Sequence, residues 1–265
     1  MTRNNQKWYD KPTTKLILIT IAITWMFPLF GFLLSSFRPG ESIKRTSWWD
    51  AIYTGTIWSE LSFDNYVEVF RAENLDRSFY NSLAVTIPST IIPITIAAFA
   101  AYAFAFMEFK GKDILFLFVV GSMIIPLQMS LIPLVQLFKD GIEIAGIPII
   151  PALDLNGTFV ATWFAHTGFG LPLATFLLRD FMMGLPKSVI ESAKIDGASH
   201  FTTFFKLVLP LSVAGIAAFG TFQFLWVYND FLVANVFLGI YKPENLVVTS
   251  HMSQIVVGRL VRPGT

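Results

Sequence analysis

The 265-residue sequence predicts an all-α fold, a polytopic transmembrane helical bundle, from its composition, its charge-free stretches and the prolines inside them. Hydrophobic residues make up 54% of the chain and charged residues 14%, whereas soluble domains average about 45–50% and 25%. A soluble fold with 27 Phe residues would have too little polar surface to cover its apolar side chains. Lipid is therefore expected to be part of its solvent.

Five stretches contain no Asp, Glu, Lys or Arg, and each reaches the roughly 20 residues that a helix needs to cross a bilayer. The first is too long for a removable signal peptide and lacks its small-residue cleavage pattern, so we interpret it as a permanent span. Prolines inside the stretches are tolerated in membrane helices because neighbours satisfy the freed carbonyls. No repeat or linker divides the chain, which predicts a single transmembrane domain, 1–265. The predicted spans are 16–37, 78–107, 114–138, 155–178 and 207–229.

The density of Lys and Arg predicts a cytoplasmic N-terminus, because basic residues are retained on the inner side of short loops. Segments 1–15, 108–113 and 179–206 then lie inside and hold ten of the 19 Lys and Arg residues in about half the external length. The segment 38–77 faces outward, and Thr265 is external. Tryptophans near the predicted span ends are interpreted as interfacial anchors: Trp8, Trp25, Trp48, Trp49 and Trp226.

The segment 185–211, LPKSVIESAKIDGASHFTTFFKLVLPL, carries the signals of two short helices joined by a turn. Ser188 and Glu191 stand at capping-box spacing and predict a helix start. Asp196 and Gly197 favour a left-handed stop or a tight turn. A second short helix is then expected to lead directly into the fifth span.

This cytoplasmic loop would expose six large apolar side chains to water. Contiguous apolar surface usually meets a partner, but the same residues could pack on the ends of the chain's own spans, and the pattern leaves both readings open. Glu191 and Asp196 are interpreted as a helix cap and a turn, and no catalytic residue is predicted. The apolar side chains are Val189, Ile190, Ile195, Phe201, Phe204 and Phe205.

The run ESAKIDGASHFTTFFKLVLPL resembles the EAA motif of binding-protein-dependent ABC importer permeases, whose core reads roughly E-A-A-x-x-D-G-A before the L-P step seen here at Leu209 and Pro210. Ser192 replaces an Ala of the motif, and Ala214 stands where many members have a second Pro. In that family two short helices couple the spans to a separate cytoplasmic ATPase. The resemblance assigns coupling, within the loop 185–210, to Glu191, Ser192, Ala193, Asp196, Gly197, Ala198, Phe201 and Phe205.

Further segments resemble sugar-type permeases related to the maltose importer, and among these the α-glucoside permeases: SFDNYVEVF (62–70), NSLAVT (81–86), HTGFGLPLATFLLRDFM (166–182) and FLWVYNDFL (224–232). The resemblance implies a type I ABC importer permease fold in the prokaryotic plasma (inner) membrane. Such permeases have six spans, so we interpret the five found here as a truncated set. The implied partners are a dimeric ATP-binding subunit, a second related permease, an extracytoplasmic solute-binding protein and membrane lipid.

Several activities are not expected of this chain. It lacks the G-x-x-x-x-G-K-[ST] phosphate loop, so ATP hydrolysis, with ATP and Mg²⁺, is expected in a separate subunit; this chain is not an enzyme and needs no cofactor. It has no Cys and a net charge of +1, which gives no sign of disulfides, thiol chemistry or a nucleic-acid partner. His166, His200 and His251 are too scattered for a metal site.

Polar side chains within the spans are candidates for a substrate path, since unpaired polar groups facing lipid are costly. Amide groups suit sugar hydroxyls and aromatic rings cover a pyranose face, and the resemblance points to an oligosaccharide or α-glucoside. Each group could instead join two helices. The alternatives are a non-sugar ABC permease or a secondary transporter, although the five spans lack the charged groups that ion coupling needs. The candidates are Gln128, His166, Gln223, Tyr228 and Asn229.

Overall fold

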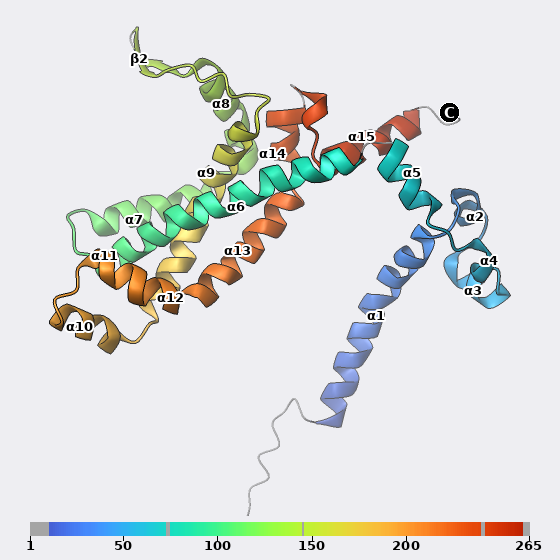
Figure 1. Cartoon of the computed structure of the whole chain (residues 1–265), viewed down its shortest axis with the longest axis horizontal. Coiled ribbons are helices and arrows are strands. Elements are labelled where there is room, and N and C mark those ends of the chain that lie inside the picture. The colour runs from blue at the N-terminus through green and yellow to red at the C-terminus, as the bar shows by residue number, and fades with distance from the viewer. Residues whose placement is uncertain (1–10, 73–74, 145, 240–241, 262–265) are drawn as a thin grey trace, which may run out of the picture. The chain divides into compact units, whose positions relative to one another are not determined.

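The computed structural model describes residues 11–72, 75–144, 146–239 and 242–261, and it is almost entirely helical (Figure 1). The predicted all-α class is therefore confirmed, apart from one short hairpin. Contacts divide the chain into two compact units, 1–75 and 76–265, where the sequence was interpreted as one domain. That both units belong to a single membrane domain stays a prediction.

The first unit begins with α1 (Pro12–Ser36), whose first residue suits a helix start because Pro lacks the N–H that would be unpaired there. Most of its side chains are exposed, on every side of the helix; Gly31 is buried, and Thr14 and residues 34–36 are half-buried. Such exposure is expected for a helix surrounded by lipid. The expected external segment forms four short helices, a detail that composition did not reveal. They are α2 (Gly40–Arg45), α3 (Trp48–Thr54), α4 (Ile57–Glu60) and α5 (Asp64–Ala72).

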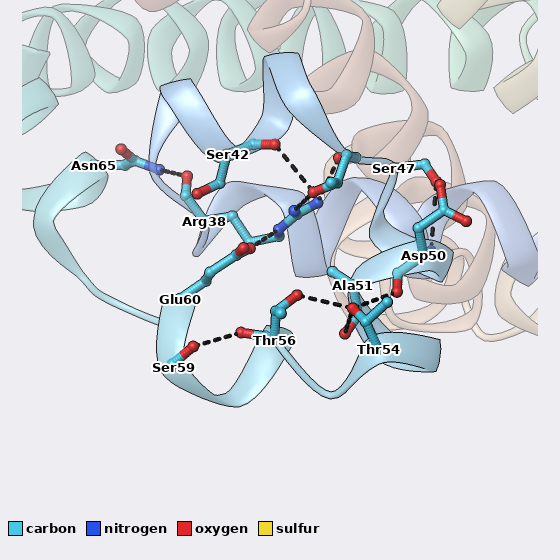
Figure 2. Close-up of polar contacts among 11 residues, drawn as sticks. Arg38, Ser42, Ser47, Asp50, Ala51, Thr54, Thr56, Ser59, Glu60 and Asn65 are labelled. Carbon is cyan, nitrogen blue, oxygen red and sulfur yellow. Dashed lines mark hydrogen bonds and ion pairs between the residues drawn. The ribbon is translucent and has the colours of Figure 1, made fainter.

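A buried cation organises these helices around the end of α1 (Figure 2). Arg38 is fully buried; its Nε lies 2.6 Å from Oε2 of Glu60, and its two terminal nitrogens donate to the carbonyl and hydroxyl of Thr46. The amide of Asn65 donates to the carbonyls of Ser36 and Arg38. Carbonyls left unpaired at the end of a helix are thereby satisfied.

The second unit opens with the 32-residue α6 (Leu75–Phe106), which matches the second predicted span. The third predicted span, 114–138, is broken into α7 (Lys112–Gly121), the 3₁₀ turn η2 (Ser122–Ile124) and α8 (Leu127–Asp140), with a bend of 104°. Pro126 accounts for the break, because the residue before a proline is driven from the helical region, and Ile125 is extended at φ −71°, ψ 118°.

A hairpin that the sequence did not predict follows α8. Its strands, β1 (Ile142–Ile144) and β2 (Ile147–Ile150), pair antiparallel, with Ile142 opposite Ile150. The fourth predicted span corresponds to α9 (Phe159–Met183), which is capped by Thr158, whose hydroxyl accepts from the backbone N–H of Ala161. The hairpin side chains are largely exposed, so it is not part of the core.

The remainder runs through α10 (Lys187–Ile195), α11 (His200–Thr203), the π-helical turn η3 (Phe204–Val208), α12 (Leu209–Leu211) and α13 (Val213–Tyr228). The segment from His200 to Leu211 bends by 68° against α13, within the fifth predicted span. After it come α14 (Leu232–Ala234), the π-helical turn η4 (Asn235–Gly239), the 3₁₀ turn η5 (Pro243–Asn245) and α15 (Val248–Val261).

Among the described residues, α1 and α6 alone are long and apolar enough to cross a membrane as single helices, and up to four spans result if each bent pair counts as one. The five predicted crossings stay predictions. The largest core cluster of the second unit joins the loop 185–210 to α6, α9 and α13. It comprises Ala97, Ala98, Ala101, Tyr102, Ala174, Leu178, Met182, Ile190, Phe204, Val208 and Phe219.

Candidate functional site

The predicted helix–turn–helix is present in residues 185–210, which we call the coupling loop after their predicted role, and its turn has a defined backbone geometry. Gly197 has φ +71° and follows the last residues of α10. Its N–H donates to the carbonyl of Lys194, and the N–H of Ala198 donates to the carbonyl of Ala193 at 2.9 Å. This pair of hydrogen bonds is a Schellman motif, which needs a left-handed residue that Gly supplies without steric cost. The predicted left-handed stop at Gly197 is confirmed.

The second half of the loop is fixed at both ends. Ser199 caps α11 by accepting from the backbone N–H of Thr202 at 3.2 Å. The hydroxyl of Tyr102, on α6, lies 3.1 Å from Nδ1 of His200. Phe204 is buried against the Tyr102 ring, with centroids 5.2 Å apart. Because Tyr102 belongs to a long helix, displacement of α11 would be transmitted directly into the helical bundle.

The coupling loop has an inner and an outer face. Ile190, Ala193 and Phe204 are each no more than 6% exposed, so these side chains attach the loop to the chain's own helices. Ile195 and Phe201 are 85% and 71% exposed, although both are large and apolar. Packing on the chain's own helices is therefore confirmed for the inner face, whereas docking of a partner on the outer face stays a prediction.

The outer face continues through Phe205, whose ring lies 4.5 Å from that of Phe201. Glu191 precedes Ile195 by four residues, which places both on one side of α10. Glu191 is exposed, and its carboxylate has no hydrogen bond or ion pair within the part of the chain that the structure describes. We call Glu191, Ile195, Phe201 and Phe205 the outer face below.

Three details of the sequence interpretation change. The capping box is wrong: α10 begins at Lys187 with Pro186 as its N-cap, so Ser188 and Glu191 lie inside the helix and no side chain caps it. Ala193 is buried and so belongs to the inner face. Ile195, which the motif does not assign to coupling, is the most exposed large apolar residue of the loop. Ser192, Asp196 and Gly197 are exposed and Ala198 is half-buried.

The five candidates for a substrate path do not form one cluster. Gln223 is buried between helices, where its amide donates to the carbonyl of Ser89 at 3.3 Å and its Oε1 has no partner. His166 is also buried, with Nε2 unpaired. Gln128 is exposed, Tyr228 stacks on its own helix against Phe224, and Asn229 bonds back to the carbonyl of Leu225.

Asp230 is a largely buried acidic residue, 11% exposed at its side chain, that sequence reasoning missed. Its Oδ2 accepts from the backbone N–H of Ala234 and lies 3.8 Å from Nε2 of His166, too far for a hydrogen bond. Burial raises the pKa of the Asp230 carboxyl. Hydrogen bonds from the backbone amides of 232–234 lower it, but burial has the larger effect. Its place directly after the fifth charge-free stretch was the signal available in the sequence. Among the described residues, no group of three possible ligands could hold a metal ion.

Comparison with solved structures defines the fold. A bacterial ABC transporter involved in the import of the acidic polysaccharide alginate superposes with a TM-score of 0.67 at 15% identity, over 94% of this chain and 84% of that chain. The fold is thus that of a type I ABC importer permease, as predicted.

Sequence comparison then gives the family. Residues 93–252 match the family described as binding-protein-dependent transport system inner membrane component, and the chain belongs to it. The osmoprotective compounds uptake permease protein GgtD of Synechocystis sp. is 42% identical over 90% of this chain and 76% of its own length. The alpha-glucoside transport system permease protein AglG of Rhizobium meliloti is 49% identical over 78% of this chain, which spans about half of that relative (52%). The chain is therefore a multi-pass inner-membrane permease.

Proposed function

We propose that this chain is the permease subunit of an ATP-driven carbohydrate importer, forms half of the translocation path and couples it to a separate cytoplasmic ATPase. The observation that carries the proposal is the two-faced coupling loop. Its inner face is packed into the helical bundle, and its outer face presents Ile195 and Phe201 to solvent. A loop of this kind can transmit the displacement of a bound partner to the spans.

The chemistry of the outer face suits a protein groove. Two aromatic rings in contact, Phe201 and Phe205, provide apolar area, and aromatic anchors commonly dominate binding energy. The carboxylate of Glu191 supplies one unpaired charge for a donor on the ATPase. ATP and Mg²⁺ would be held by that ATPase dimer, with no cofactor in this chain. Coupling residues proposed from the motif are Glu191, Ser192, Ala193, Asp196, Gly197, Ala198, Phe201 and Phe205, to which we add Ile195.

An oligosaccharide or α-glucoside is the substrate we propose. Support comes from the similarity to the alpha-glucoside permease AglG and to the arabinooligosaccharides permease AraQ of Halalkalibacterium halodurans, 31% identical over 80% of this chain and 70% of its own. The unpaired Gln223 amide oxygen and His166 nitrogen are buried hydrogen-bonding groups of the kind that sugar hydroxyls satisfy. A second permease would complete the path, and an extracytoplasmic solute-binding protein would deliver the sugar.

Docking is tested by changing the loop without changing the core. Gly197→Asp and Glu191→Lys are expected to abolish uptake while the chain remains in the membrane. Glu143→Lys, an exposed Glu of the hairpin, is the matched control for charge reversal and should transport normally. Three quantities are measured for each variant: uptake, co-purification with the ATPase, and stimulation of ATP hydrolysis by that ATPase. Normal uptake by both loop variants would refute the docking role.

The same assay separates the alternatives. A secondary transporter would continue uptake when ATP is depleted and the ion gradient is clamped. A non-sugar ABC permease would lose uptake with ATP, but its solute-binding protein would bind no carbohydrate in a calorimetric screen. The proposal requires both ATP dependence and carbohydrate binding.

A further inference from the structure

Helix α3 folds back along α1 instead of projecting away from its end. The Trp48 indole lies 4.9 Å from the Phe27 ring and 6.0 Å from the Phe30 ring, measured between centroids. It also fills the space beside Gly31, where an added Cβ would overlap the indole ring. At 1.5 Å per residue, Gly31 is about 8 Å and Phe27 about 14 Å from the end of α1 at Ser36.

These distances place Trp48 at membrane depth. The charge-free run from Leu16 to Phe37 is about 33 Å long as a helix, close to the roughly 30 Å of the hydrocarbon core. Its end at Phe37 therefore marks one hydrocarbon boundary. Trp48 contacts α1 on the hydrocarbon side of that boundary, so α3 begins below the level at which the chain leaves the span.

The α3–α4 pair, residues 48–60, exposes large aromatic side chains. Trp49, Tyr53 and Trp58 are 55%, 92% and 79% exposed, while Ala51 and Ile57 are buried between the helices. Trp and Tyr favour the membrane interface because an apolar body and a polar tip suit its two sides. Exposure of this size on such a short segment is unusual for a surface that faces water.

Polar groups in the same segment are satisfied internally (Figure 2). Residues 46–63 contain only two charged side chains: Asp50 is hydrogen-bonded to Ser47, and Glu60 is paired with buried Arg38. The Ser and Thr hydroxyls bond within the cluster too, at Thr46, Ser47, Thr54, Thr56, Ser59 and Ser62. Internal satisfaction is what a low-water environment requires.

The preceding helix has the opposite character. In α2, Glu41, Lys44 and Arg45 have side chains 72–78% exposed and pair only with one another. Charges therefore collect on α2 and aromatic side chains on α3 and α4. The division matches an element that lies at the surface of a bilayer with one side in lipid.

We propose that α3–α4 is an interfacial membrane anchor, with Trp49, Tyr53 and Trp58 embedded among the lipid headgroups and upper acyl chains beside α1. This surface is then closed to water and to the solute-binding protein. Lipid is favoured over a protein partner because the pair is continuous with the lipid-exposed span α1 and descends to the depth of its Gly31.

The chain has no Cys, so single substitutions give unique labelling sites. Tyr53→Cys and Trp58→Cys, with Glu41→Cys as the aqueous control, are labelled with the fluorophore NBD. The full chain is assembled with Cys-free partner subunits in phosphatidylcholine–phosphatidylglycerol vesicles, with and without lipids carrying nitroxide on the upper acyl chain. Elution on size exclusion checks assembly of each variant.

At positions 53 and 58 we expect blue-shifted emission, quenching by the nitroxide lipids and loss of quenching by aqueous iodide. At position 41 we expect the reverse. Iodide quenching at 53 and 58 equal to that at 41 would overturn the proposal. Blue-shifted emission without nitroxide quenching would overturn it as well, because a protein would then cover the surface. Repeating the measurement without the solute-binding protein shows whether that protein is the cover.

Discussion

Gly197 illustrates how one backbone angle can decide a docking surface. A Cβ at this position would meet nothing within 4 Å, so an uncharged substitution acts through the left-handed backbone, which costs most residues about 1–2 kcal/mol, whereas Gly197→Asp also adds a negative charge to the docking surface. Gly197→Ala is therefore expected to weaken coupling, and Gly197→Asn to retain most of it, because Asn tolerates this conformation. ATPase stimulation and uptake are the readouts.

The control is Gly40→Ala, at the start of α2, where φ is ordinary and the added Cβ also meets nothing. It should transport as the unaltered protein does. Equal activity of the Gly197→Ala and Gly197→Asn variants would contradict the conformational argument, since the two differ mainly in their left-handed preference.

Gly170 and Gln223 form a second pair at the residue scale. A Cβ on Gly170 would lie 2.7 Å from the buried Gln223 Nε2, so Gly170→Ala should destabilise by about 1–3 kcal/mol through overpacking. Adding Gln223→Ala removes the obstructing amide and should recover much of that loss. Thermal unfolding in detergent measures the cycle; additive effects of the two changes would disprove direct packing.

Some residues could be predicted and others could not. Gly197 was predictable because Asp-Gly after an apolar helix has a local conformational reason. That Ala193 is buried and Ile195 exposed could not be predicted, because a nine-residue helix apolar on two sides does not reveal which side its own bundle covers. The proximity of Asp230 to His166 joins segments 64 residues apart and depends on tertiary packing alone.

At the scale of elements, the α1 end depends on one buried ion pair. Glu60→Ala would leave the fully buried Arg38 without its carboxylate, and removal of one partner from a buried pair costs about 3–5 kcal/mol. We expect α2–α4 to loosen and trypsin to cleave faster at Lys44 and Arg45. Limited proteolysis followed by mass spectrometry locates the cuts.

The comparison is Glu41→Gln, which breaks two exposed ion pairs, with Lys44 and Arg45, each worth at most about 1 kcal/mol. Its cleavage rate should stay near that of the unaltered chain. Faster cleavage in Glu41→Gln than in Glu60→Ala would mean that the Arg38 pair does not hold these helices.

Helices themselves were well predicted, whereas their breaks were not. Absence of charge identified α1, α6 and α9 within a few residues, because crossing a bilayer demands long apolar segments. The absence of charge says nothing about the direction of the helix axis. The segments that bend by 104° at Pro126 and by 68° before α13 were therefore each predicted as one continuous span. Short helices α2–α5 were missed because tertiary contacts fix them: Arg38 binds Glu60 and Thr46, Trp48 packs on α1, and Asn65 and Tyr66 bind Ser36 at its end.

For the whole molecule, the distribution of basic residues predicts which ends of the helices share a membrane face. Ile195 is in the coupling loop, with ten of the 19 Lys and Arg residues on its side, whereas Glu143 lies in the hairpin before α9. One predicted crossing, α9, separates them, so they should face opposite compartments.

In intact cells, a membrane-impermeant maleimide should label Glu143→Cys at once and Ile195→Cys only after permeabilisation. Both sites are exposed, which makes reactivity a measure of side and not of burial. Labelling of both in intact cells would mean that α9 does not cross the bilayer, and labelling of Ile195→Cys alone would reverse the orientation and remove the coupling loop from the reach of a cytoplasmic ATPase.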